Sequence, residues 1–79
     1  MDITKKVSDL IVKPIEKLGY IVDDITYQKE DGNYYLRVII DKVGGITIDD
    51  CVDVSRCIDP ILDKEDLIED NYILDVCSK

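Results

Sequence analysis

The feature that most constrains the fold is a run of regular alternation at residues 34–41. Every second side chain is apolar, and these positions are Tyr34, Leu36, Val38 and Ile40. The residues between them are more mixed and comprise Tyr35, Arg37, Ile39 and Asp41. A period of two places successive side chains on opposite faces of a strand. The run therefore predicts a strand with one face against a core and with Arg37 and Asp41 meeting water at the ends of the other.

A second strand is expected at residues 20–28, so that the two strands form a hairpin. Its side chains divide into two sets: Ile21, Ile25 and Tyr27 on one face, and Val22, Asp24 and Thr26 on the other. Asp23 falls on the apolar side, where a carboxylate is unfavourable. The residues between the strands, Glu30-Asp31-Gly32-Asn33, contain the Asp-Gly pair that favours positive φ in tight hairpin turns.

Two helices are predicted, at residues 3–18 and at about 49–62. Gly19 is expected to end the first helix, and Pro14 is expected to kink it or split it near Lys13. Thr47 or Asp49 is expected to cap the start of the second helix.

Pro60 and Asp63 are expected to mark the end of the second helix. Its buried stripe is predicted to consist of Cys51, Val54, Ile58, Ile61 and Leu62. The charged residues predicted to face away from that stripe are Asp49, Asp50, Asp53, Arg56 and Asp59.

Gly44-Gly45 breaks the chain before the second helix, and an acidic loop or short helical turn at 63–71 precedes a last strand, 72–77. The order α-β-β-α-β predicts a two-layer α+β fold, a three-stranded sheet with both helices on one face. This topology is KH-like, but the GXXG loop and basic flanks of RNA-binding KH domains are absent from the sequence. A right-handed crossover makes the third strand parallel to the second. We expect it beside the first strand, which gives an all-antiparallel sheet.

Charge is distributed unevenly along the 79 residues, whose formal net charge is −8. Residues 1–40 hold seven acids and six bases, whereas residues 41–79 hold eleven acids and four bases. The second half therefore carries −7, a field that repels phosphate backbones and attracts basic proteins. Solubility alone is an alternative explanation for this acidity.

The sequence argues against an enzyme, a metal site and a membrane protein. It has no histidine, no GxxxxGK[ST] or GxGxxG motif, and no CxxC pair. Its cysteines, Cys51, Cys57 and Cys77, are odd in number and fit free thiols in a reducing cytosol. Charged residues throughout 1–18 exclude a signal peptide or membrane span there. We expect no cofactor and no small-molecule substrate.

Five short segments together resemble one protein family across nearly the whole chain. They are Leu18-Gly19-Tyr20, residues 36–41, residues 45–51 with Val54-Ser55-Arg56, Ile61-Leu62-Asp63 and residues 72–78. In this order and at these spacings, they resemble the N-terminal domain of the bacterial ribosome maturation factor RimP family.

The resemblance implies a non-enzymatic, cofactor-free factor that assists assembly of the small (30S) ribosomal subunit in the bacterial cytoplasm. Family members carry a second, SH3-like barrel domain, which this chain lacks. The family continues after the last strand with Ser-Pro-Gly, whereas here Lys79 follows Ser78. We therefore expect residues 1–79 to be the first domain of a two-domain protein. Cys77 stands where the family often has serine.

The resemblance and the charge together indicate that the partner is an immature small subunit, and that the chain contacts a basic ribosomal protein on it. The candidate binding residues are Asp41, Asp49, Asp50, Asp53 and Arg56, which would supply electrostatic steering and ion pairs. Four of the five also have a structural explanation: helix capping for Asp49 and Asp50, intrahelical pairing with Asp53 and Asp59 for Arg56, and closing the strand end for Asp41.

Other functions remain open from the sequence. The chain could be an RNA-contacting KH-like module, which the charge disfavours, or a purely structural half that positions the barrel. An acidic mimic of nucleic acid is a further alternative, which the resemblance makes remote.

Overall fold

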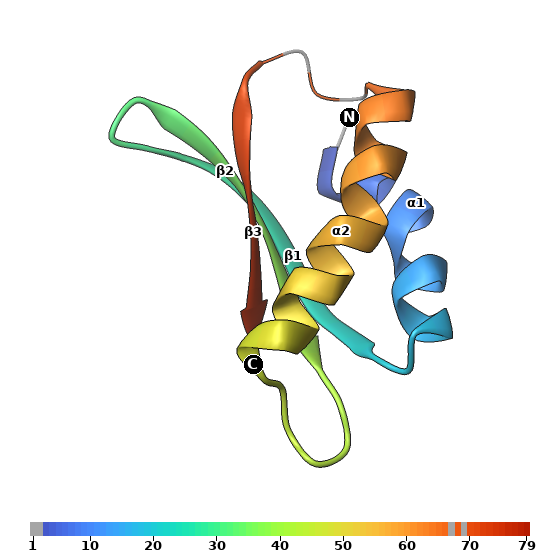
Figure 1. The fold of residues 1–79 in the computed structure, drawn as a ribbon. Helices are drawn as coiled ribbons and strands as arrows, with labels where there is room; N and C mark the ends of the chain where they lie inside the picture. Colours follow the sequence, from blue (N-terminus) through green and yellow to red (C-terminus); the bar gives the residue numbers. More distant parts are fainter. Residues whose placement is uncertain (1–2, 67, 69) are drawn as a thin grey trace.

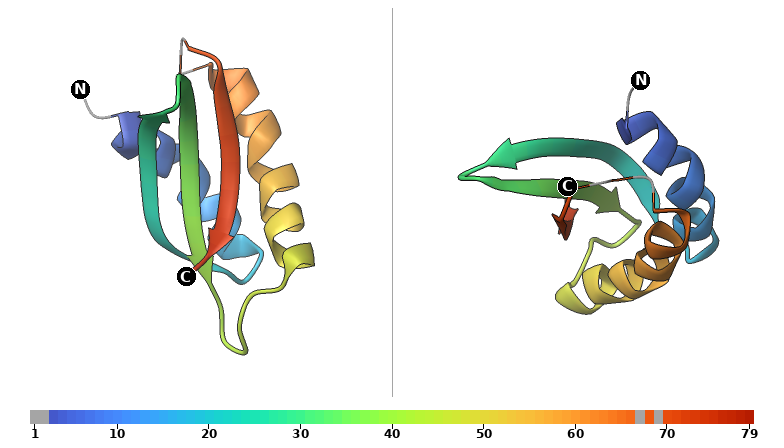
Figure 2. Two further views of the ribbon diagram at one scale, coloured as in Figure 1. Left: turned by 90° about the vertical axis from the view of Figure 1, so that its left-hand side faces the viewer. Right: turned by 90° about the horizontal axis from the view of Figure 1, so that it is seen from above.

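The computed structural model describes residues 3–66, 68 and 70–79, and the order of elements is α-β-β-α-β (Figure 1). The elements are α1 (Ile3–Lys17), β1 (Ile21–Glu30), β2 (Asn33–Asp41), α2 (Ile48–Glu65) and β3 (Tyr72–Ser78). Both helices cover one face of the sheet and leave the other face open, as Figure 2 shows. The predicted two-layer α+β fold is therefore confirmed.

The sheet is mixed, with the strand order β1-β2-β3. β2 pairs antiparallel with β1 and parallel with β3, in a register that runs from Tyr34↔Tyr72 to Ile40↔Ser78. The predicted all-antiparallel sheet, with the third strand beside the first, is wrong. The central position gives β2 a neighbour on each side, and its apolar residues Leu36, Val38 and Ile40 are fully buried. The strand with the most regular apolar row thus gains the most burial, which favours this order over the predicted one.

An irregularity in β1 reverses the alternation of its side chains. The register with β2 shifts between Val22 and Asp24, so that Asp23 is the extra residue of a β-bulge. As a result Val22 packs against the core together with Ile25 and Tyr27, whereas Ile21 is 57% exposed. The prediction that Ile21 shares a face with Ile25 and Tyr27 is wrong, because a bulge exchanges the two faces.

The hairpin between β1 and β2 has the two-residue turn expected from Asp-Gly. Asp31 and Gly32 have φ values of 51° and 83°, and Glu30 pairs with Asn33 across the turn. Positive φ at both central residues is the requirement of a type I′ turn, whose twist matches that of the strands.

The end of α1 follows the expected glycine signal. The N–H of Gly19, at a φ of 94°, donates to the carbonyl of Glu16, and the N–H of Tyr20 donates to the carbonyl of Ile15. This pair of bonds is a Schellman motif, and Tyr20 and Ile15 are both buried beside it. Pro14 lies inside α1, which continues past Lys13, so of the two expected effects the split does not occur. The core-facing neighbours Ile11 and Ile15 hold the turns on both sides of the proline.

α2 begins as predicted and extends further than predicted. Thr47 is its N-cap, but the helix continues through Pro60 to Glu65 and ends where Asp66 adopts a left-handed conformation. The expected end at Pro60 and Asp63 is wrong, because the last turn closes beyond them, where the N–H of Asp66 donates to the carbonyl of the buried Leu62. Pro60 itself is exposed, so water can solvate the carbonyl that loses its partner.

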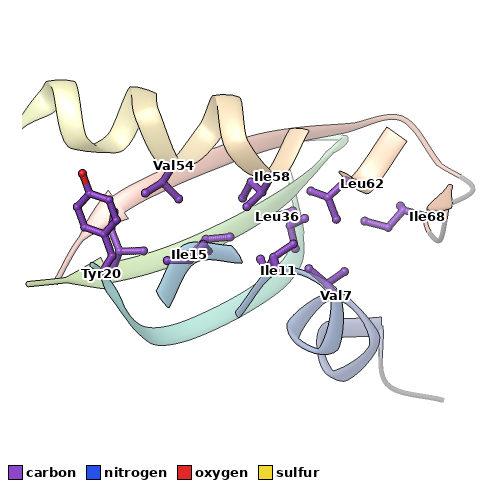
Figure 3. Packing of buried hydrophobic residues seen from close by; sticks show 11 residues of the cluster. Val7, Ile11, Ile15, Tyr20, Leu36, Val54, Ile58, Leu62 and Ile68 are labelled. Atoms are coloured by element: carbon purple, nitrogen blue, oxygen red, sulfur yellow. The ribbon is translucent and has the colours of Figure 1, made fainter. Parts of the chain in front are cut away.

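The core lies between the helices and β2. In Figure 3 its side chains come from α1, β2 and α2, with Tyr20 at one end and Ile68 at the other. The fully buried members are Val7, Ile11, Ile15, Leu36, Val38, Ile40, Val54 and Ile58. Each contributes about 1.5–3 kcal/mol of transfer free energy. Tyr72, Leu74 and Val76, which alternate along β3, pack against this cluster.

Candidate binding surface

The five candidate residues do not form one surface in the structure, and Asp50 differs most from the prediction. The residue is buried, with 9% of its surface exposed, although the sequence pattern predicted that it would face away from the buried stripe of α2. Asp50 is the third residue of α2, on the side that turns toward Tyr20 and the core. The prediction of an outward-facing Asp50 is wrong.

Asp50 is held by three neighbours, which we call the Asp50 cluster: Tyr20, Lys42 and Thr47. The Tyr20 hydroxyl donates to Oδ1 at 2.7 Å, and Lys42 Nζ lies 2.8 Å from Oδ2. The Thr47 N–H donates to Oδ2 at 2.9 Å, and the Asp50 N–H donates back to Thr47 Oγ1 at 3.2 Å. This reciprocal pair is a capping box, which satisfies two backbone donors at the start of the helix. Figure 3 shows the Tyr20 hydroxyl directed toward that end of α2.

The cluster changes the ionisation of both acidic partners. The Lys42 ammonium, then the Thr47 N–H and the Tyr20 hydroxyl, hold the pKa of the Asp50 carboxyl well below its usual range. The hydrogen bond to Asp50, together with burial, raises the pKa of Tyr20 to about 12. Asp50 is therefore a charged, fully engaged group of the fold rather than a group available to a partner.

Three of the other candidates share the outer face of α2, which we define as Asp49, Asp53 and Arg56. They recur at helical spacing, and all three are exposed. None of them forms an ion pair with any residue that the structure describes, so the expected pairing of Arg56 with Asp53 and Asp59 is not observed. These charges are accessible to a partner.

Asp41 lies apart from this face. It ends β2 and alternates with the buried Ile40, which places it on the open side of the sheet. Its Oδ1 accepts a hydrogen bond from the Lys42 N–H at 2.9 Å, which agrees with its expected role at the strand end.

The open face of the sheet carries a charge network that is largely self-neutralised. The Arg37 guanidinium donates to both carboxylate oxygens of Glu30, at 2.9 and 3.0 Å, and lies 3.5 Å from Asp75. It also covers the Tyr35 ring at 5.1 Å from the centroid. The hydrogen bond from Arg37 lowers the pKa of Glu30, and the Glu30 carboxylate raises the pKa of Arg37. A guanidinium engaged in this way is poorly placed to neutralise phosphate.

Sequence reasoning missed a groove between α2 and β3. Two hollows of about 350 and 370 Å³ lie along it. We define the α2–β3 groove by the residues that line them from the two elements and the helix cap. On the helix side these are Ile48, Cys51, Val52, Ser55, Arg56, Asp59, Asp63 and Asp66, and on the strand side they are Tyr72, Leu74 and Val76. Arg56 thus borders both this groove and the outer face of α2. Six of the helix-side residues, Ile48, Val52, Ser55, Asp59, Asp63 and Asp66, recur every three or four positions, a signal that could have been read as a second stripe.

Comparison with known protein families matches residues 10–79 to the RimP N-terminal domain. The chain belongs to the RimP N-terminal domain family. The family is one of ribosome maturation factors and is non-enzymatic, in agreement with what the five sequence segments implied. The match begins inside α1 and includes the Asp50 cluster, the outer face of α2 and the α2–β3 groove.

Within this RimP-type domain, the described residues include no group of three or more side chains placed to hold a metal ion. Over the same residues, no helix combines the length and the apolar character needed to cross a membrane. The thiols of Cys51, Cys57 and Cys77 are free and partly buried. Burial, followed by the carboxylate of Asp75, raises the pKa of Cys77.

Proposed function

We propose that this RimP-type domain assists maturation of the small ribosomal subunit in the bacterial cytoplasm without catalysing a reaction, by binding a basic ribosomal protein on the immature subunit. The proposal places the contact on the outer face of α2 and leaves Asp50 to the fold. In the complete protein we propose that an SH3-like barrel follows this domain and shares in binding.

The observation that carries the proposal is the set of unpaired charges on the outer face of α2. Asp49 and Asp53 are exposed and have no cation within ion-pairing distance among the described residues. Over residues 48–65, α2 holds six acids and two bases, whereas residues 3–17 of α1 hold two acids and four bases. The negative field is thus concentrated on one of two neighbouring helices, and such a patch steers basic partners.

The open sheet face gives less support to an RNA-contacting function. Affinity for RNA depends on cations that neutralise phosphates. Arg37, at the centre of that face, is already held by Glu30 and Asp75. The exposed charges of α2 are mostly acidic, so they are better suited to a basic protein than to RNA.

The test is retention of immature small subunits by the chain at low and at moderate salt. Replacing Asp49 and Asp53 by asparagine removes two exposed charges, each worth about 0.2–1 kcal/mol in a surface pair. We expect about two- to thirty-fold weaker retention, with a shallower salt dependence.

A matched control replaces two exposed acids on α1, Asp9→Asn with Glu16→Gln, and we expect it to leave retention unchanged. Equal losses in both double variants would show that net charge alone matters and would contradict a specific surface. Binding to naked ribosomal RNA that matches binding to the subunit would favour the RNA-contacting alternative. No retention at any salt would mean that the domain serves only to position other parts of the protein.

A further inference from the structure

β3 is an edge strand with one side unoccupied. In the order β1-β2-β3 it hydrogen-bonds to β2 alone, so the N–H and C=O groups on its other side have no strand partner among the described residues. In Figure 2, β3 lies at the margin of the sheet, with α2 behind it. An unprotected edge is a template for another extended segment.

The α2–β3 groove runs beside this edge and changes character along its length. Near the end of β3, Ile48 and Val52 form an apolar wall opposite Val76, and they are 84% and 41% exposed. Arg56 lines the same hollow, so this end favours the apolar rather than the basic side chains of a partner. Apolar side chains so exposed next to a strand edge lower the free energy when a partner covers them.

The other end of the groove is acidic. Asp59, Asp63, Asp66 and Asp70 line the hollow near Tyr72 and Leu74. None of these four carboxylates has a cationic partner among the described residues. The pKa of Tyr72 is raised by burial and by the charges of Asp63, Asp59 and Asp66, which agrees with a negative field at this end.

We propose that the α2–β3 groove binds an extended segment of a basic protein, which adds a fourth strand to the sheet at the edge of β3. The segment places apolar side chains against Ile48 and Val52, and lysine or arginine side chains against Asp59 and Asp63. This inference rests on the proposed function for the class of partner and adds its conformation and a second contact surface.

The geometry specifies the spacing within that segment. Tyr72 and Val76 are four strand residues apart, which corresponds to about 13 Å. Side chains two and four positions apart lie on the same face of a strand. The apolar anchors and the basic residues of the partner should therefore fall on one face, separated by about four residues.

Two other modes of covering an edge fit the molecule less well. A second copy of this chain brings another net charge of −8 to an acidic groove, which opposes association. The opposite edge of the sheet, on β1, carries the bulge at Asp23, whose carboxylate lies 3.3 Å from Lys79 Nζ. Bulges and charges of this kind protect an edge from pairing.

The test uses synthetic peptides and the 79-residue chain, followed by amide NMR shifts and hydrogen exchange. One peptide has lysine at positions 1 and 3, valine at 5 and 7 and threonine elsewhere, and a second has the reverse order. A control peptide of the same composition places the lysines and valines on opposite faces. We expect one of the two ordered peptides to bind at about 1 mM or below, to protect amides of β3, and to exceed the control.

Paired variants locate the contact. Ile48→Ser removes an apolar wall of the groove, whereas Val43→Ser changes a side chain that is 98% exposed in the loop before α2. We expect the first to weaken peptide binding about tenfold and the second to leave it unchanged. Asp59→Asn with Asp63→Asn should weaken binding, and Asp9→Asn with Glu16→Gln should not.

Absence of peptide binding, equal binding of the control peptide, or shifts confined to the open sheet face would overturn the inference. Shifts in β3 that grow with protein concentration alone would assign the edge to self-association and overturn it as well. Subunit retention that depends on Asp49 and Asp53 but is indifferent to Ile48→Ser would leave the proposed function standing and remove the groove from it.

Discussion

Asp49 and Asp50 are neighbours in the chain, yet they belong to two regions with opposite properties. Asp50 sits in a cluster where Tyr20, Lys42 and Thr47 all engage its carboxylate. Asp49 lies one residue away, on the outer face of α2, exposed and without an ion pair to any described residue. A rotation of about 100° per residue along a helix is enough to send one carboxylate to the core boundary and the other to solvent.

Acidic residues that are adjacent in the sequence can therefore have different functions. The Asp50 cluster uses a carboxylate to complete a cap and neutralise a lysine, so its charge belongs to the stability of the domain. The outer face of α2 leaves its charges unsatisfied, and these are the ones a basic partner can use. The contrast would be contradicted by variants in which Asp49 is needed for stability or Asp50 for binding alone.

The largest expected effect is on the stability of the Asp50 cluster. Thr47→Ala removes the N-cap and should cost about 0.5–2 kcal/mol, which corresponds to about 4–8 °C in Tm for each kcal/mol. Asp50→Ala should cost more, because it also leaves Lys42 and the Tyr20 hydroxyl without their partner. Asp49→Ala should cost no more than about 1 kcal/mol, the loss of one favourable charge near the helix start. Thermal unfolding of the three variants checks the order, and equal losses at Asp49 and Asp50 would contradict it.

The pH dependence of stability should carry the signature of the same cluster. The pKa of Asp50 is lowered on folding, so its contribution is complete above its ordinary value of 3.8 and is lost as the pH falls below that value. The pKa of Tyr20 is raised from 10.0 to about 12, so its contribution is complete below pH 10 and is lost between about pH 10 and 12. Denaturant unfolding of the wild type, Asp50→Asn and Tyr20→Phe across both ranges measures these slopes. Asp50→Asn should flatten both limbs, because the hydrogen bond to Asp50 is the first cause of the raised pKa of Tyr20. Tyr20→Phe should flatten the alkaline limb and leave most of the acid limb, because Lys42 and Thr47 still lower the pKa of Asp50. Unchanged slopes would contradict the assignment.

A smaller contrast is expected between two tyrosines of the core. The Tyr20 hydroxyl donates to Asp50, whereas the Tyr27 hydroxyl is buried with no hydrogen-bond partner among the described residues. Tyr20→Phe should therefore lower Tm. Tyr27→Phe should leave Tm unchanged or raise it, since the ring keeps its stacking on Tyr34 at 5.2 Å between centroids. A larger loss at Tyr27 than at Tyr20 would contradict this contrast.

The smallest effect on stability is expected at the exposed acids of α2, which we propose to bind the partner. Asp53→Asn and Asp59→Asn change exposed groups with no described ion pair, so each should alter the free energy of unfolding by less than about 0.5 kcal/mol. A double variant that unfolds like the wild type yet binds immature subunits less well would sharpen the comparison. A marked loss of stability would place these acids with Asp50, in the fold.

Much of the domain could be predicted from local patterns. The alternation in β2, the Asp-Gly turn and the glycine that ends α1 each depend on residues adjacent in the chain, and each is confirmed. The candidate surface could be predicted in part, since Asp49, Asp53 and Arg56 do share an exposed helix face. One signal in the sequence could have predicted that Asp50 takes part in the helix cap. It is the three-residue spacing between Thr47 and Asp50, which is typical of a capping box.

The elements, their order and the concentration of acid after residue 40 could be predicted from the sequence, because period, turn chemistry and charge are properties of neighbouring residues. The central place of β2, the bulge that turns Ile21 outward and the burial of Asp50 became apparent only in the folded chain. Those outcomes depend on partners distant in the chain: Tyr20 meets Asp50 across thirty residues, and β3 meets β2 through the whole of α2. The groove beside β3 arises in the same way, because its two walls come together only when the helix packs on the sheet.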